Sequence, residues 1–263
     1  LYYSQRLMEL PLGMFTIAVS TVLFPRIAML AAQDDRTGMG RAYAQGLRLI
    51  LAITVPAALG LVALRVPIVR VLFEHGKFDD SSVAEIAPVI AISALSIPFF
   101  SLASLAVRGF YAQKDMGTPV YVAKVDFFLN IALTLIFMIP LGTCGLALAN
   151  LISSIFQCFM LQHLAVKRGT PLARPPIGRA VAGIGIAGTG MLVFALAAWW
   201  GLQSAFGDTR ITWLLHTRAS DLAAIFGLIP LAVVFYLILL RAVKFEEWPE
   251  LRELGLHLLR KRK

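Results

Sequence analysis

The sequence has little charge for its length, and this shortage limits the class of protein. Charged residues make up 15% of the 263 residues, whereas 59% are hydrophobic, and the mean hydropathy is +0.78. A soluble domain carries about 25% charged residues, because its surface has to be hydrated. The composition therefore excludes an ordinary soluble domain and predicts an integral membrane protein.

Cysteine and histidine are also scarce. Cys144 and Cys158 are predicted to share one helix at about 21 Å along its axis, so they cannot form a disulfide within one chain. The four histidines are scattered, and none has a second ligand one helical turn away, so we expect neither a metal site nor a bound cofactor. The net charge of +9 comes with no RNA-binding or helix-turn-helix pattern, and we expect no nucleic-acid partner.

Long hydrophobic runs dominate what is present. A helix needs about 20 mostly apolar residues to cross a bilayer. Seven runs meet this requirement, so the sequence predicts an all-α polytopic membrane protein with seven transmembrane helices. They cover residues 7–30, 46–64, 86–107, 118–140, 142–165, 177–200 and 221–243.

Lys and Arg follow an alternating pattern around these runs, with eighteen on one side of the membrane and six on the other. Because cytoplasmic connections carry the basic excess, the first residue is predicted outside and the carboxyl terminus inside. The chain begins at Leu1 without a signal peptide, and many transporters consist of two related halves. We therefore expect this chain to be the carboxyl-terminal part of a longer protein.

Gly183, Gly185 and Gly188 form a literal G-x-G-x-x-G, a pattern that elsewhere marks a dinucleotide site. Here no strand precedes it, and the surrounding run is apolar. Small residues in such a run allow helices to approach closely, so we interpret the glycines as a packing surface.

Ionisable residues inside the runs are informative, because they are costly in a bilayer and usually face a cavity or a partner. Arg6 and Glu9 are one helical turn apart, and Pro11 frees the carbonyl of Leu7 beside them. This combination predicts a kinked, charged entry to a cavity. The alternative is that Arg6 only reaches the outer headgroups.

Asp126 and Asn130 lie one turn apart in the fourth run, whereas Lys124 points to another side of the helix. A carboxylate and an amide on one face are suited to binding a cation or carrying a proton. They are equally suited to hydrogen bonding with a neighbouring helix. Pro56, Pro88, Pro98 and Pro230 interrupt three other runs, a pattern that favours a moving transporter over a passive anchor.

Three motifs resemble those of the MurJ/MviN lipid II flippases. The opening YYSQRLMELPLG is similar to the start of the eighth membrane helix in that family, and the other two motifs are FEHGKF at 73–78 and GFYAQKDMGTPV at 109–120. The resemblance implies helices 8–14 of a fourteen-helix multidrug/oligosaccharidyl-lipid/polysaccharide exporter fold. It also implies a transporter of the bacterial inner membrane, not an enzyme, that acts in cell-wall synthesis.

The resemblance further implies a substrate and its binding groups. Such flippases move an undecaprenyl-pyrophosphate-linked peptidoglycan precursor from the inner to the outer leaflet by alternating access, and an arginine matching Arg6 is functional. We therefore assign Arg6 and Glu9 to substrate binding, together with arginines from the missing amino-terminal half. Asp126 and Asn130 are assigned to coupling with a cation or the membrane potential. Guanidinium groups suit this substrate because they form forked hydrogen bonds with phosphate.

These expectations divide the chain into three parts. Residues 1–165 form five helices of the transporter lobe, 166–244 form two additional helices with a possible lipid-tail groove, and 245–263 form an amphipathic basic cytoplasmic tail that contacts membrane lipids. The alternative for the tail is a solvated segment. The alternative functions are a polysaccharide or drug exporter of the same superfamily, an intramembrane enzyme, and a structural subunit.

Overall fold

The computed structural model describes residues 17–73, 80–173, 175, 177–206, 210–211, 217–243, 245, 247–249 and 251. Within them the regular secondary structure is helical except for one antiparallel pair of two-residue strands, so the predicted all-α class is confirmed. The elements are α2 (Ile17–Ala32), α3 (Arg36–Ala63), α4 (Arg65–Phe73), α5 (Asp80–Ala94), α6 (Ser96–Ala112), α7 (Gly117–Lys167), α8 (Gly178–Phe206), β1 (Arg210–Ile211), β2 (Thr217–Arg218), α9 (Ala219–Ala223), the π-helix η2 (Ala224–Leu228) and α10 (Ile229–Ala242).

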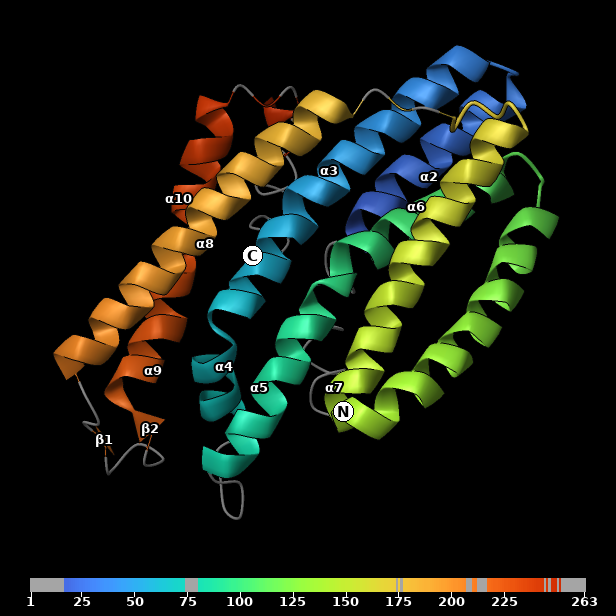
Figure 1. The fold of residues 1–263 in the computed structure, drawn as a ribbon. Helices are drawn as coiled ribbons and strands as arrows, with labels where there is room; N and C mark the ends of the chain where they lie inside the picture. The colour runs from blue at the N-terminus through green and yellow to red at the C-terminus, as the bar shows by residue number, and fades with distance from the viewer. Residues whose placement is uncertain are drawn as a thin grey trace.

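Five helical segments of the described residues are long and apolar enough to cross a membrane. One of them, α7, is two helices in sequence, because the chain reverses at Gly142, where φ is 55° and ψ is −128°. Glycine is suited to this position because a positive φ costs it little. The arms 117–141 and 143–167 match the two predicted runs on either side of residue 141, and Figure 1 shows them as a hairpin.

Two predicted spans differ from the structure at their ends. α3 begins at Arg36, well before the predicted residue 46, because the carboxylate of Asp35 caps it by accepting a 2.8 Å hydrogen bond from Gly38 N. Hydropathy alone does not detect this polar first part of the helix. The span predicted at 86–107 consists of α5 and α6, which are separated by a single turn residue, Leu95.

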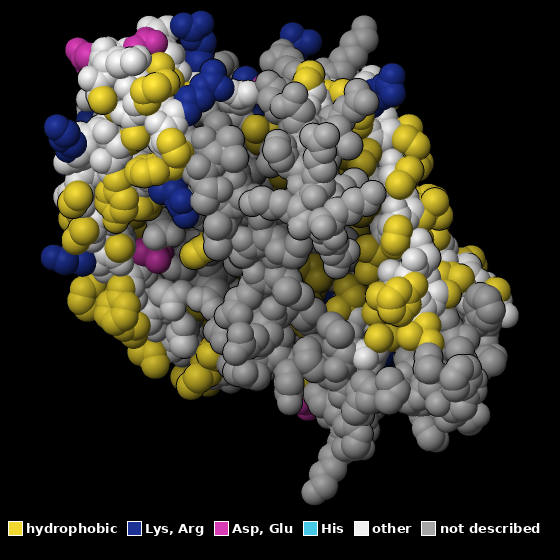
Figure 2. Space-filling model, turned by 180° about the vertical axis from the view of Figure 1, so that it is seen from behind, with side chains coloured by type: hydrophobic (Ala, Val, Ile, Leu, Met, Phe, Trp, Pro, Cys, Tyr) yellow, Lys and Arg dark blue, Asp and Glu magenta, His cyan; other side chains and the backbone are white. Residues whose placement is uncertain are grey.

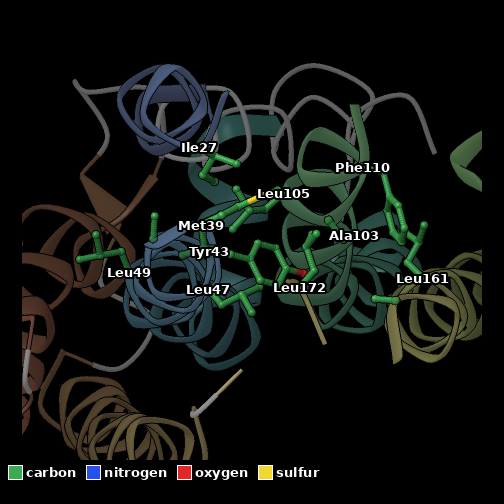
Figure 3. Packing of buried hydrophobic residues seen from close by; sticks show 14 of the residues in the cluster. Ile27, Met39, Tyr43, Leu47, Leu49, Ala103, Leu105, Phe110, Leu161 and Leu172 are labelled. Atoms are coloured by element: carbon green, nitrogen blue, oxygen red, sulfur yellow. The ribbon is translucent and has the colours of Figure 1, made fainter. Parts of the chain in front are cut away.

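α3 is the central helix of the described fold and packs against α2, α5, α6 and α8 (Figure 1). Its first half contributes Met39 and Tyr43 to a core cluster that also contains Leu105 and Phe110 of α6. Figure 3 shows these side chains with Leu172, which comes from the connection between α7 and α8 and lies beside Tyr43. A connecting segment therefore helps to close this end of the core.

α8 packs closely on its neighbours because of its glycines. A Cβ atom on Gly183 would lie 2.8 Å from Val243, and one on Gly188 would lie 2.9 Å from Leu59. The predicted packing role of these two glycines is confirmed. Gly185 is different, because a Cβ there would meet no atom within 4 Å.

Candidate functional site

The two residues predicted to bind substrate, Arg6 and Glu9, lie outside the described residues. The same holds for Glu74–Phe78 of the second motif. The site is therefore built from three described features: the polar contacts within the α7 hairpin, an apolar groove between α3, α8 and α10, and the turns at one end of the helices.

Asp126 and Asn130 lie on the first arm of α7 and both contact its second arm. The hydroxyl of Ser153 donates to Asp126 Oδ1 at 2.5 Å, and Asn130 Nδ2 donates to Asn150 Oδ1 at 3.1 Å. Ser153 is buried and Asp126 is half-buried, whereas Asn150 is exposed. The sequence placed the acid and the amide on one face, but it gave no signal that their partners would come from the following span.

Lys124 is exposed, and residues two positions apart on a helix, such as Lys124 and Asp126, do not face each other. The first arm also carries large exposed side chains, including Phe127, Phe128 and Ile139 at 61%, 69% and 87% exposure. In Figure 1 this arm lies at the edge of the molecule, beside the second arm of the hairpin. Its two polar contacts therefore matter for holding the arms together, since side-chain hydrogen bonds can join helices in a membrane.

An apolar groove of about 380 Å³ lies between α3, α8 and α10. Ala52, Pro56 and Gly60 line it from α3, while Met191 lines it from α8 and Tyr236 from α10. Pro56 has no N–H to donate to the carbonyl of Ala52, and the hydroxyl of Tyr236 donates to that carbonyl instead, at 2.8 Å. The groove is thus lined by aliphatic surface, and the polar atoms at its proline kink are paired.

A second apolar cavity of about 860 Å³ lies on another side of α3. It is bounded by α3, α6, the second arm of α7 and the start of α8, and Cys158 is among its lining residues. Both cavities can accept hydrocarbon and neither presents a charged side chain in its lining. They differ in that only the first is lined by the last transmembrane segment.

Three connections at one end of the helices have the same backbone structure. Asp34, Lys114 and Gly169 all have φ between 56° and 60°, and each is followed by a residue whose N–H bonds five residues back. This is the Schellman ending of a helix. The bonds run from Asp35 N to Leu30 O, from Asp115 N to Phe110 O and from Thr170 N to Ala165 O, each at 3.0 Å.

Two of these connections also have similar sequences, AQDD at 32–35 and AQKD at 112–115. In both, the last aspartate accepts a hydrogen bond from the backbone N–H three residues later. This four-residue similarity, repeated after 80 residues, was the available signal for the shared turns. The third motif of the sequence thus contains a helix-ending turn followed by a helix cap.

The three connections also contact one another. Arg168 donates to Asp115 Oδ2 at 2.7 Å, and Arg36 donates to the carbonyl of Gly169 at 2.6 Å. Burial raises the pKa of Asp115, but the hydrogen bonds from Thr118 and the charge of Arg168 outweigh it and hold the pKa below its ordinary value. Asp115 therefore remains ionised and links two connections that are more than fifty residues apart.

Metal binding finds no support among the described residues, where no three His, Cys, Asp or Glu side chains are grouped closely enough to hold an ion. The two cysteines are both free thiols on the second arm of α7. The arrangement is suited to moving or holding an apolar chain and contains no described set of catalytic groups.

Comparison with known proteins gives consistent matches. The family described as lipid II flippase MurJ matches residues 1–216. A probable lipid II flippase MurJ of Vibrio cholerae is 32% identical over 249 residues, covering 91% of this chain and 44% of the relative. One of Thermotoga maritima is 28% identical, covering 97% of this chain and 47% of the relative.

A solved structure described as lipid II flippase MurJ, inward closed conformation, superimposes with a TM-score of 0.71. It is 26% identical in sequence, and the match covers 90% of this chain and 45% of that one. The chain therefore spans less than half the length of the relatives that it matches here.

Proposed function

Because the chain belongs to the lipid II flippase MurJ family, we propose that the full-length protein moves a lipid-linked peptidoglycan precursor across the inner membrane. The observation that carries this proposal is the family match over residues 1–216, together with a fold shared with a solved member. The protein is then a multi-pass transporter of the bacterial inner membrane and not an enzyme. Alternating access, from inner to outer leaflet, is the mechanism that fits two lobes of helices.

This chain contributes helices 8–14 of the fourteen in the proposed transporter. Residues 1–165 would form part of the moving lobe, and 166–244 would add the two helices beside it. The three Schellman connections carry Arg36, Lys114, Lys167 and Arg168 and lie at the upper end of the molecule in Figure 1. Most of the Lys and Arg side chains visible in Figure 2 are also in its upper half, which supports a cytoplasmic position for this end and an extracytoplasmic first residue.

Arg6 and Glu9 bind the pyrophosphate end of the precursor in this proposal. The support is the YYSQRLMELPLG motif and the chemistry of the guanidinium group, which can replace the lost hydration of a phosphate with two charge-assisted hydrogen bonds. Arginines from the other half of the protein would complete the site. Glu9, one turn from Arg6, would hold the guanidinium in position while the site is empty.

The prenyl tail of the precursor occupies the groove between α3, α8 and α10. This assignment is supported by the apolar lining of the groove and by the glycines that bring α8 close to its neighbours. α10 and α8 are the last two spans, and the resemblance implies a tail groove there. A hydrocarbon chain makes contacts of similar strength with lipid and with an apolar groove. Moving along the groove therefore costs it little free energy.

Asp126 and Asn130 couple transport to a cation or to the membrane potential. This proposal is supported by the position of Asp126 within a membrane helix. An acid there costs free energy, so it usually has a function or a partner. Ser153 and Asn150 are the partners in the described structure, so coupling would require these contacts to exchange during the cycle. The coupling ion is part of the transport cycle and no resident cofactor is proposed.

Complementation tests the main proposal. Cells depleted of their own flippase should be rescued by the full-length protein and not by the same protein with Arg6→Ala, at equal expression. Exposure of the precursor on the outer leaflet, measured in the same cells, should fall in parallel with growth. Complete rescue by Arg6→Ala would remove Arg6 from the binding site, and absence of rescue by the unmodified protein would favour another exporter of the superfamily.

A further inference from the structure

Two ion pairs involving buried acids flank the groove between α3 and α10. At one end Arg48 of α3 pairs with Glu247, which follows α10. At the other end Arg70 of α4 lies 4.0 Å from Asp221 of α9. Asp221 is fully buried and Glu247 is 4% exposed, so both acids lie in the interior of the described fold.

The order of residues along the chain places the groove between these pairs. On α3 and α4, Arg48 precedes the lining residues 52–68 and Arg70 follows them. On the last span, Asp221 precedes the lining residues 229–237, and Glu247 lies between them and Leu251, which also lines the groove. Between the pairs, the hydrogen bond from Tyr236 to Ala52 joins the two helices, while α10 packs mainly on α8.

The two buried acids and their part-buried arginines need an explanation, because taking charges out of water is costly and an apolar pair of similar size is often as stable. What an ion pair offers is specificity of position, since it forms only when both groups are at the correct place along their helices. Two such pairs, one at each end, fix both the register and the separation of the α3–α4 segment and the last span.

The Arg70–Asp221 pair also lies next to an irregular part of the last span. η2 begins three residues after Asp221 and is a π-helix. Such segments are rare interruptions of a regular helix and are frequent at functional sites, so a change of register is most easily placed here. With Asp221 held by Arg70, any such shift would move α10 and not the start of the span.

We propose that Arg48–Glu247 and Arg70–Asp221 are clasps that set the width of the α3–α10 groove. This inference rests on the proposed function, because the prenyl tail is the chain for which the width is set. The four residues are positioning residues and do not contact the tail. The clasps hold the ends of the last span against α3 and α4, and the space between them admits a hydrocarbon chain.

The width of the groove can be measured without the precursor. Cysteines replacing Ala57 and Val233, which line the groove from opposite helices, would be bridged by a short bifunctional thiol reagent in full-length protein in lipid nanodiscs. Cys144 and Cys158 are replaced by alanine in every variant. Glu247→Gln and Asp221→Asn keep the shape of the side chains and remove the charge, and each should change the bridging rate by at least about threefold, the effect of one typical interhelical contact.

Charge exchange provides the rescue. Arg48→Glu combined with Glu247→Arg should return the bridging rate to within about twofold of the original, whereas either change alone should not. Arg41→Glu is the matched control, because Arg41 is an exposed cation on the same helix. Bridging rates that stay unchanged in folded Glu247→Gln and Asp221→Asn proteins would overturn the clasps.

A second readout separates this inference from the proposed function. A photoreactive C55 polyprenyl phosphate should label α10 in the unmodified protein and label it several-fold less in Glu247→Gln. The unmodified protein could fail to capture the probe while the bridging rates still respond to the charge changes. That result would overturn the tail site, and the clasps would remain as supports of the last span. Equal capture by the unmodified protein and Glu247→Gln would overturn the link between clasp and tail.

Discussion

The hydroxyl of Tyr236 donates a 2.8 Å hydrogen bond to the carbonyl of Ala52, which lies four residues before Pro56. Pro56 has no N–H, so it leaves this carbonyl without its usual partner inside the helix. The last transmembrane span therefore supplies the donor that a proline in another span took away. The two residues joined are 184 positions apart in the chain.

Removing this donor should destabilise the protein, and restoring the N–H should compensate. Tyr236→Phe should lower the free energy of unfolding by about 0.6–1.7 kcal/mol, the range for hydrogen bonds between membrane helices. Pro56→Ala gives the Ala52 carbonyl a donor within α3, so Tyr236→Phe should cost much less in that background. Unfolding in detergent, measured for the two single variants and the double variant, gives the coupling energy, and additive losses would show that the two positions are independent.

Asp115 should make stability depend on pH at the acidic end. Its pKa in the folded protein lies below the ordinary value near 3.8, so its contribution is complete above that value and is lost as the pH falls through the lower, folded pKa. Asp115→Ala should remove both this acid dependence and a helix cap, at a cost of about 1 kcal/mol. Thermal unfolding of both proteins between about pH 3 and 6 is the measurement.

Arg168→Ala is the companion variant for Asp115. It leaves the cap of Thr118 in place and removes a partner that is half exposed, so the loss should be smaller, about 0.2–1 kcal/mol, and should shrink with added salt. We assign the larger part of the stabilisation by Asp115 to the helix cap and the smaller part to its ion pair with Arg168. Equal losses of stability in Arg168→Ala and Asp115→Ala would contradict this assignment.

Gly145 should be intolerant of any side chain. A Cβ atom there would lie 2.1 Å from the carbonyl oxygen of Phe137 on the other arm of α7, and a backbone carbonyl cannot rotate away as a side chain can. Gly145→Ala should therefore open the hairpin and cost at least about 1–3 kcal/mol. Gly201→Ala, in the helix α8 with no atom within 4 Å, is the control and should be neutral or slightly stabilising in a melting experiment.

Ser153 should tune the proposed coupling role of Asp126. Removing its hydroxyl takes away a hydrogen bond of 2.5 Å to the carboxylate, so Ser153→Ala should shift the cation concentration for half-maximal transport by about threefold. Asp126→Asn should make transport by reconstituted full-length protein insensitive to collapse of the ion gradient. Ser154→Ala is the control, because that hydroxyl bonds to the carbonyl of Asn150 in its own helix. Gradient-dependent transport in Asp126→Asn would exclude Asp126 as the coupling group.

The sequence alone located the long apolar helices that the structure describes between residues 36 and 242, because hydrophobicity and helix formation depend on neighbouring residues. It located the reversal between residues 140 and 142, and it assigned Gly183 and Gly188 to helix packing from their small size. It also supplied the motifs that identify the family. It did not predict the polar start of α3, because a cap formed by one aspartate extends a helix beyond its apolar part.

Only the tertiary structure decided which helices meet. The partners of Asp126, the donor for Ala52 and the acids paired with Arg48 and Arg70 all come from distant parts of the chain. Apolar surfaces are chemically alike, so no residue pattern specifies which two of them will pack. The choice depends on the shapes of whole helices, on small residues that permit close approach, and on buried polar groups that must find partners.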